Sequence, residues 1–195
     1  NDFASIVNAI EEGRHIYADI KKFILYLLSS NVAEVLVIFT AILLGLPLPL
    51  IALQILWMNL ITDGLPALAL GVEPTSNSVM NQNPRIMHEK ILGKKSSITI
   101  VAIALMATIG VLLVFEYFLP YGLAYAQTVA FSTLVMFQLC NVFNFKSEQS
   151  IFKTNIFNNK KLLGAVILSI LLQIAVIYTP LSKIFKTVPL DFKDW

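Results

Sequence analysis

Residues 23–44 read FILYLLSSNVAEVLVIFTAILL, an apolar run that contains a single carboxylate, Glu34. The hydrocarbon core of a bilayer is about 30 Å thick, and about 20 mainly apolar residues in a helix cross it. Helices of this length and apolarity are rare in the cores of soluble proteins. The run therefore predicts a helix that spans a membrane.

The composition of the whole chain predicts the same surroundings. Of the 195 residues, 57% are hydrophobic and 13% are charged, whereas a soluble domain has about 25% charged residues. So few charges cannot cover a surface exposed to water, and we therefore expect a lipid bilayer to surround the chain. We expect no nucleic-acid partner.

Four further stretches are apolar enough to cross the bilayer. The five predicted spans are residues 23–44, 50–70, 98–119, 128–145 and 162–178. The expected fold is all-α, an integral membrane bundle of five transmembrane helices (23–195) behind an N-terminal cytoplasmic stalk helix (1–22). Apolar residues recur at helical spacing in that first segment, at Phe3, Ile6, Val7 and Ile10. The segment either transmits motion from a cytoplasmic domain or simply lies at the membrane surface.

The basic residues predict the orientation of the bundle. Lys and Arg precede the first span and fill the loops after the second and fourth spans, whereas residues 45–49 and 120–127 contain none. Cytoplasmic loops carry an excess of Lys and Arg, so we expect the N-terminus in the cytoplasm and the C-terminal tail on the other side. Three lysines in that tail, Lys183, Lys186 and Lys193, run against the rule.

Polar side chains within the first two spans mark a candidate site. A charged side chain at the centre of a membrane costs about 2.5–3.5 kcal/mol on insertion scales and usually marks a pathway or a site. Glu34 lies near the middle of the first span, and Asp63 lies past the middle of the second. Asn31 shares a helix face with Glu34, and Asn59 and Thr62 share one with Asp63, because their spacings are those of one helical turn.

Pro66 predicts that the second span loosens locally. Proline lacks an N–H and clashes with the carbonyl four residues earlier, which is that of Thr62. Irregular backbone at this depth persists only where it lines a cavity that is buried in protein or filled with water. Freed carbonyls therefore join the side-chain oxygens as candidate ligands.

The candidate ligands are all oxygen atoms, with no His or Cys nearby. Oxygen ligands suit hard cations, and Ca²⁺ takes about 6–8 of them. The alternative is that these groups form hydrogen bonds between helices, but two carboxylates with three polar partners favour a cation site. On spacing alone, Gln138 in the fourth span serves equally well as a ligand or as a contact between helices.

Proton countertransport is a further expectation. A low dielectric disfavours the charged form of a carboxylate that has lost its cation. We therefore expect Glu34 and Asp63 to take up protons when the cation leaves.

Several stretches resemble one family, the P-type Ca²⁺-ATPases. Residues 26–34 (YLLSSNVAE) look like the fifth transmembrane helix of these pumps, and residues 56–67 (LWMNLITDGLPA) look like the sixth. Residues 81–85 (NQNPR) resemble the loop that follows, 138–144 (QLCNVFN) the eighth helix, and 189–195 (PLDFKDW) the loop before the tenth. The resemblance covers the whole chain and is greatest to the sarco/endoplasmic-reticulum-like pumps and their bacterial relatives.

The resemblance implies a role for each site residue. Asn31, Glu34 and Thr62 match ligands of the first Ca²⁺ site, Asn59 matches a ligand of the second, and Asp63 matches the residue that bridges both. Residues 3–22 match the stalk that joins the phosphorylation domain.

Gln138, the sixth candidate ligand, stands where two-site pumps carry a glutamate. The amide keeps an oxygen but loses a charge, which favours one Ca²⁺ per cycle. Glu34 argues the other way, because several one-site relatives lack a carboxylate there.

The residues and the resemblance together predict the membrane ion-binding part of an ATP-driven pump that moves Ca²⁺ out of the cytoplasm, in a bacterial plasma membrane. The phosphorylation motif, the dephosphorylation loop, the nucleotide domain and the fourth helix of the family do not occur in this sequence. We therefore expect neither catalytic nor cofactor-binding residues in it. Hydrolysis of ATP with Mg²⁺ is expected of a parent protein, whose other domains are the expected partners.

Three alternatives keep a role for these residues. In the first alternative, the transported ion is Mn²⁺, which oxygen sites also accept, or a monovalent cation, although Na⁺/K⁺-type pumps carry an aspartate at the position of Asn59. In the second, the chain is a subunit of a channel or secondary transporter, although no inverted repeat is visible in it. In the third, the chain is a non-catalytic assembly module held together by buried polar contacts.

Overall fold

The computed structural model describes residues 2–72, 92–146 and 159–195, and within these ranges it is helical with no strand, which confirms the predicted all-α fold class. In chain order the elements are α1 (Asp2–Leu43), α2 (Ala52–Trp57), the π-helical turn η1 (Met58–Thr62), α3 (Gly64–Leu70), α4 (Lys94–Phe118), the 3-10 turn η3 (Leu119–Tyr121), α5 (Leu123–Lys146), α6 (Lys160–Tyr178), α7 (Ser182–Phe185) and the 3-10 turn η6 (Phe192–Asp194).

Five helical segments are long and apolar enough to cross a membrane, as predicted. They are Phe3–Leu43, Ala52–Leu70, Lys94–Tyr121, Leu123–Lys146 and Lys160–Tyr178. The expected stalk and the first span form one helix, α1, without a break. The fourth segment begins at Leu123, earlier than residue 128, because Gly122 ends the preceding turn with a φ of 117°, which favours glycine.

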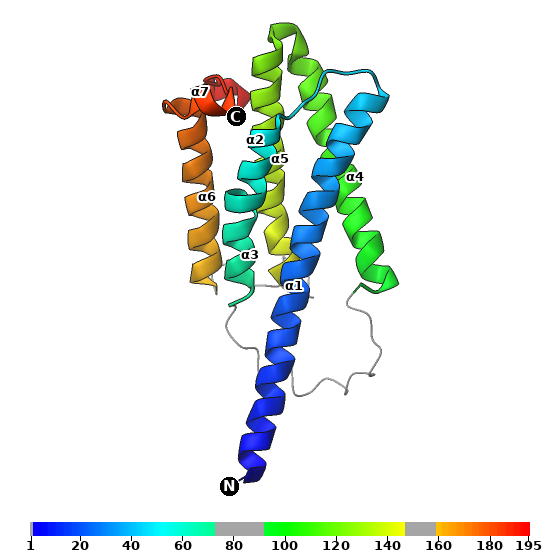
Figure 1. Ribbon diagram of the computed structural model, residues 1–195, viewed down its shortest axis with the longest axis vertical. Coiled ribbons are helices and arrows are strands. Elements are labelled where there is room, and N and C mark those ends of the chain that lie inside the picture. Colours follow the sequence, from blue (N-terminus) through cyan, green and yellow to red (C-terminus); the bar gives the residue numbers. More distant parts are fainter. Residues whose placement is uncertain (1, 73–91, 147–158) are drawn as a thin grey trace.

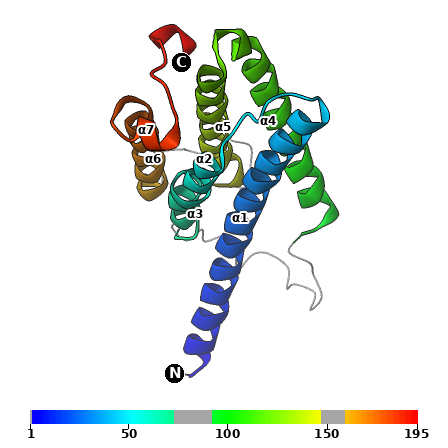
Figure 2. The same ribbon diagram turned by 45° about the horizontal axis from the view of Figure 1, so that its top comes forward.

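The helices stand side by side in a bundle that α1 overshoots at one end (Figure 1). The end with α7 and the C-terminus, at the top of Figure 1, is called the upper end, and the end toward the N-terminus of α1 is called the lower end. Figure 2 shows the second span, α2–η1–α3, between α1 and α6. Helix α1 packs mainly against α4, α4 against α5, and α3 against α6. The second span therefore contacts protein on several sides.

Small residues allow α1 and α4 to approach each other closely. Ala33 and Ala41 of α1 and Ala104 and Ala107 of α4 are buried in one core cluster. Association of helices in lipid depends on such close packing, since lipid supplies no hydrophobic driving force between them.

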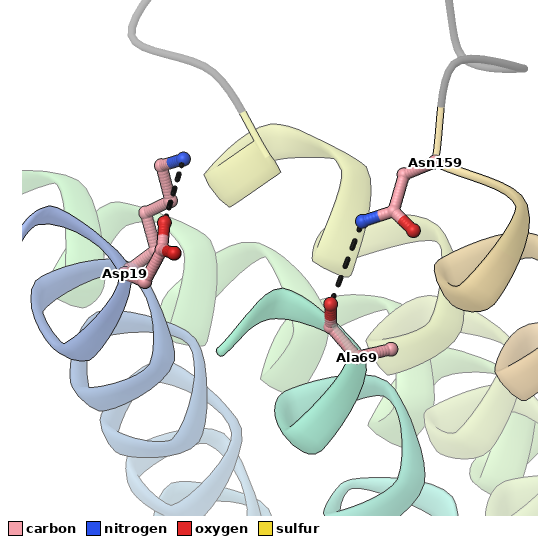
Figure 3. A network of polar contacts seen from close by, with 4 residues as sticks. Asp19, Ala69 and Asn159 are labelled. Atoms are coloured by element: carbon pink, nitrogen blue, oxygen red, sulfur yellow. Dashed lines mark hydrogen bonds and ion pairs between the residues drawn. The ribbon is translucent and has the colours of Figure 1, made fainter. Parts of the chain in front are cut away.

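Asn159 joins the lower ends of α6 and α3. Its Oδ1 accepts from the backbone N–H of Leu162 at 2.9 Å and caps α6, and its Nδ2 donates to the carbonyl of Ala69 at 3.4 Å. Figure 3 shows this contact, and beside it the pair that Asp19 of α1 forms with Lys22, one turn further along the helix. The cap satisfies backbone groups that a helix start leaves without partners.

The C-terminal segment is bound across the upper end. Thr187 Oγ1 donates to the carbonyl of Val176 in α6 at 2.8 Å, and the N–H of Val188 donates to Thr128 Oγ1 in α5 at 3.0 Å. In the second span, Gln54 Nε2 donates to the carbonyl of Phe185 at 3.1 Å. These bonds hold the second span, α5 and α6 together at that end.

Candidate cation site

The second span is irregular where the sequence places its polar residues. The N–H of Asp63 donates to the carbonyl of Met58, five residues back, at 2.8 Å, which is the bond of a π-helical turn. The regular helix resumes when the N–H of Ala67 donates to the carbonyl of Asp63 at 3.0 Å. Such a turn widens the backbone and changes the direction in which Asn59, Thr62 and Asp63 point.

The irregular turn precedes Pro66 and ends at Thr62, the residue whose carbonyl the proline was expected to free. Pro66 itself lies in the first turn of α3, where a backbone N–H has no partner within the helix and proline is tolerated. Because Pro66 has no N–H, the carbonyl of Thr62 lacks the donor that a continuous helix would give it. The interruption predicted from Pro66 therefore lies at Thr62, and the π-helical turn extends it back to Met58.

Glu34 joins three spans in the interior of the bundle. Its side chain is 3% exposed. One carboxylate oxygen accepts from Nε2 of Gln138 in α5 at 2.9 Å, and the other accepts from Nδ2 of Asn59 in η1 at 3.1 Å. The structure thus brings together three of the residues predicted from the sequence.

Asp63 lies beside this group and is completely buried. Its Oδ1 accepts from the hydroxyl of Tyr26 in α1 at 3.0 Å, two helical turns along α1 from Glu34. Two carboxylates in one low-dielectric region repel each other when both are charged. A cation between them or a proton on either relieves that repulsion.

Two buried oxygen atoms of this region, Oγ1 of Thr62 and Oε1 of Gln138, have no hydrogen-bond partner in the described part of the chain. The hydroxyl of Ser30 lies beside the Asp63 carboxylate. Buried polar atoms are nearly always satisfied, and an exception needs an explanation such as a bound ion. The unpartnered oxygens, together with those of Glu34, form a donor set that suits a hard cation.

Asn31 is not brought into this group. Its side chain is exposed, whereas Glu34 is buried. Residues three apart on a helix are separated by about 60° around its axis, so a shared face can still place one side chain inside and the other at the edge. Asn59 is also exposed, yet it contacts Glu34. The ligand role of Asn31 stays a prediction.

Tyr26 is the site residue to which the sequence reasoning gave no role. Its ring is completely buried, and its hydroxyl positions Asp63. The signal was the spacing, because Tyr26, Ser30 and Glu34 follow one another at intervals of four residues and therefore lie along one face of α1.

Asn141 joins helices. It donates to Ser29 Oγ of α1 at 3.1 Å and accepts from Asn144 at 3.0 Å. It therefore serves as a contact between α1 and α5.

The arrangement can bind a cation through two carboxylates and several neutral oxygens. Within the described ranges no cluster of three or more His, Cys, Asp or Glu side chains is present, so a resident transition metal held by such ligands has no support there. Few charged ligands in a flexible set, inside a membrane, suit an ion that enters and leaves.

Comparison with known proteins gives consistent results. A family model described as "Cation transporting ATPase, C-terminus" matches residues 47–195. The chain is 49% identical over 199 residues to a calcium-transporting ATPase of Bacillus subtilis (strain 168), an alignment that covers 100% of this chain and 22% of the relative. It is 40% identical over 214 residues to calcium-transporting ATPase 1 of Bacillus cereus (100% of this chain, 24% of the relative). It is 38% identical over 198 residues to calcium-transporting ATPase type 2C member 1 of Mus musculus (100% and 22%).

The chain therefore spans less than a quarter of the length of these relatives. The family model covers most of the chain, including the irregular second span with Asp63 and the fourth segment with Gln138. The chain belongs to the family of cation-transporting ATPases and corresponds to their C-terminal membrane region.

Proposed function

We propose that this chain is the ion-binding membrane part of an ATP-driven Ca²⁺ pump. The observation that carries the proposal is the pair of buried carboxylates, Glu34 and Asp63, beside an irregular helix and unpartnered buried oxygens. The similar proteins are calcium-transporting ATPases, which supports Ca²⁺ as the ion.

The amide side chains suggest how the site changes between its empty and occupied states. Asn59 and Gln138 now turn their NH₂ groups toward Glu34. An amide offers donors at one atom and an acceptor at the other, so a rotation of about 180° exchanges NH₂ for a carbonyl oxygen. In this proposal the carbonyl oxygens of Asn59 and Gln138 turn toward the ion when Ca²⁺ binds. Protons on the carboxylates replace the charge of the departing ion, which makes the pump a Ca²⁺/proton exchanger.

The proposal includes parts outside this chain. A fourth helix completes the ligand set, and phosphorylation and nucleotide domains supply ATP hydrolysis with Mg²⁺. The chain lies in a bacterial plasma membrane with the lower end of α1 in the cytoplasm. The distribution of Lys and Arg among the loops supports this orientation, and the relative in Bacillus subtilis supports this membrane.

Phosphoenzyme formation from ATP in the full-length protein tests the proposal, with Ca²⁺, Mn²⁺, Na⁺ and K⁺ titrated separately. We expect activation by about micromolar Ca²⁺. The affinity of protein Ca²⁺ sites depends on the number of charged ligands, and this concentration lies within its range. Asp63→Asn should abolish activation while the protein still folds, because the replacement keeps the shape and removes a charge. Asp19→Asn, on α1 below the membrane, is the matched control and should behave like the wild type.

Two other outcomes would redirect the assignment. Activation by Mn²⁺ or a monovalent ion alone would overturn Ca²⁺ and leave the pump class. Full activity of Asp63→Asn would show that the buried polar residues only form contacts between helices. In an active protein, the Hill slope for Ca²⁺ tells whether a pump with Gln138 at this position binds one Ca²⁺ ion per cycle or two.

A further inference from the structure

Helix α5 contacts α1 at three successive levels of the bundle. The contacting pairs, in order from the cation site toward the lower end, are Gln138 with Glu34, Asn141 with Ser29, and Phe145 with Tyr26. The two helices run in opposite directions, because the residue numbers rise along α5 as they fall along α1. The three α5 residues are spaced by three and four positions, so they lie on one face of that helix.

The middle contact belongs to a chain of hydrogen bonds that runs in one direction. Nδ2 of Asn144 donates to Oδ1 of Asn141 at 3.0 Å, and Nδ2 of Asn141 donates to Ser29 Oγ at 3.1 Å. The Ser29 hydroxyl donates in turn to the backbone carbonyl of Tyr26 at 2.7 Å. Asn141 and Ser29 are 3% and 0% exposed, so bulk water does not compete for these bonds.

The chain of bonds fixes the rotation of α1 at the level of Tyr26. Ser29 follows Tyr26 by one helical turn, and the tyrosine ring packs edge-on against that of Phe145, with centroids 6.3 Å apart. The Tyr26 hydroxyl donates to Oδ1 of Asp63 at 3.0 Å. Side chains extend about 5–6 Å from a helix axis, so a rotation of α1 by about 15° would move the hydroxyl by about 1.5 Å. A movement of that size breaks a hydrogen bond.

A buried amide is a poor choice for adhesion between helices alone. Its burial costs free energy unless its groups are hydrogen-bonded, and an apolar side chain of similar size has no such requirement. Between packed helices, a buried asparagine specifies the register at a cost in stability. Asn141 lies one turn from Gln138 and one turn from Phe145, so the register that it specifies is that of the candidate cation site.

We propose that Asn141 is a positioning residue of the cation site, which acts through Ser29 and Tyr26 and keeps Asp63 in its cation-free orientation. The proposal rests on the proposed function for the identity of the ion. When Ca²⁺ binds, Asp63 turns to the ion at the expense of the bond from Tyr26. The chain of bonds therefore lowers the affinity for Ca²⁺ and favours release of the ion.

The first test measures thermal unfolding in chelator, and it does not depend on the ion. Asn141→Leu and Tyr26→Phe are made singly and together in the full-length protein. A bond that is no longer positioned cannot be lost a second time. We therefore expect Tyr26→Phe to lower the unfolding midpoint less than half as much in Asn141→Leu as in the wild type. An undiminished loss would overturn the proposal. Ser132→Ala, whose hydroxyl donates within α5, is the control and should leave the Tyr26→Phe loss unchanged.

Ser29→Ala tests the same link with a smaller change. It removes one oxygen atom and leaves Asn141 in place, so it also serves where Asn141→Leu does not fold. We expect the same reduction of the Tyr26→Phe loss. A reduction in Asn141→Leu without one in Ser29→Ala would mean that α5 acts on Tyr26 through Phe145, and it would overturn the route through Ser29.

The second test measures the apparent affinity for Ca²⁺ in phosphoenzyme formation. A variant that loses more stability without Ca²⁺ than with it must bind Ca²⁺ more tightly, because these differences belong to one thermodynamic cycle. We expect Tyr26→Phe and Asn141→Leu each to raise the apparent affinity by about two- to tenfold. The double variant should not exceed the larger single effect. Factors that multiply in the double variant would show that the two residues act independently and would contradict the proposal.

The outcomes separate this proposal from the proposed function. A wild-type protein without cation-dependent phosphoenzyme would refute the pump, and the unfolding test in chelator would still decide whether Asn141 positions Tyr26. In an active pump, additive losses of stability in chelator would refute the positioning role alone.

Discussion

Tyr26 illustrates how one side chain controls another inside the bundle. The phenol is completely buried, and its hydroxyl donates to one oxygen of Asp63. Tyr26 therefore fixes the direction in which Asp63 points.

The predicted effect of Tyr26→Phe is a loss of stability that depends on the cation. Without the hydroxyl, the cation-free protein, whose carboxylates are protonated in the proposed cycle, should lose about 0.5–1.5 kcal/mol, the usual net contribution of a hydrogen bond between neutral groups. Saturating Ca²⁺ should reduce the loss, because the ion then satisfies the carboxylate. Thermal unfolding in detergent, with Ca²⁺ and with chelator, measures both values.

Tyr121→Phe is the control for this measurement, because Tyr121 is largely exposed at the upper end. An equal loss of stability with and without Ca²⁺ would show that the Tyr26 hydroxyl acts only as a structural contact.

At the scale of the element, the shape of the second span depends on where its backbone hydrogen bonds are interrupted. Pro66 fits the first turn of α3 without strain, so the irregularity is placed ahead of it, over Met58–Thr62. A π-helical turn inserts an extra residue into the helix and is frequent at functional sites. Here it turns Asn59 toward Glu34 of the neighbouring helix.

The predicted effect of Pro66→Ala is a regular second span with a poorer cation site. Alanine restores an N–H that can bond to the carbonyl of Thr62, so the regular helix of α3 can extend back through Asp63 into η1. The change should rotate Asn59 and Thr62 away from their present directions. We expect a thermal midpoint that is unchanged or raised, with an apparent Ca²⁺ affinity in the phosphoenzyme assay reduced by about tenfold or more.

Pro180→Ala provides the comparison, since this proline lies beyond the end of α6 at the upper end. Wild-type affinity in Pro66→Ala would mean that the π-helical turn does not depend on the proline.

At the scale of the whole molecule, the bundle depends on the close contact of α1 with α4. Ala104 is completely buried in the shared core cluster. Ala104→Leu should separate these helices, at a cost of about 1–3 kcal/mol for overpacking. Thermal unfolding in detergent measures the effect. Met106→Leu, two residues along and largely exposed toward the lipid, should change little; similar losses in both variants would contradict a tight contact.

The sequence predicted much of this architecture for physical reasons that can be named. Long apolar runs are read directly as spans because the bilayer thickness fixes their length. Carboxylates in those runs are conspicuous, so Glu34 and Asp63 were found without a structure. The partners of the carboxylates were harder to predict. Whether Gln138 meets Glu34 depends on how α5 and α1 are rotated about their axes, and the role of Tyr26 depends on the rotation of the second span. The spacing of residues along one helix does not determine these rotations.

The length of α1 has a mechanical consequence. At 1.5 Å per residue its 42 residues form a rod about 63 Å long, of which the lower part projects beyond the bundle (Figure 1). Measured from Leu43, Glu34 lies about 14 Å along this rod and Asp2 about 62 Å along it. If the rod swings about its upper end, a displacement of about 4 Å at Asp2 moves Glu34 by about 1 Å, which is enough to break a hydrogen bond. In such a swing the helix would convert a movement of about 4 Å at its lower end into one of about 1 Å at Glu34.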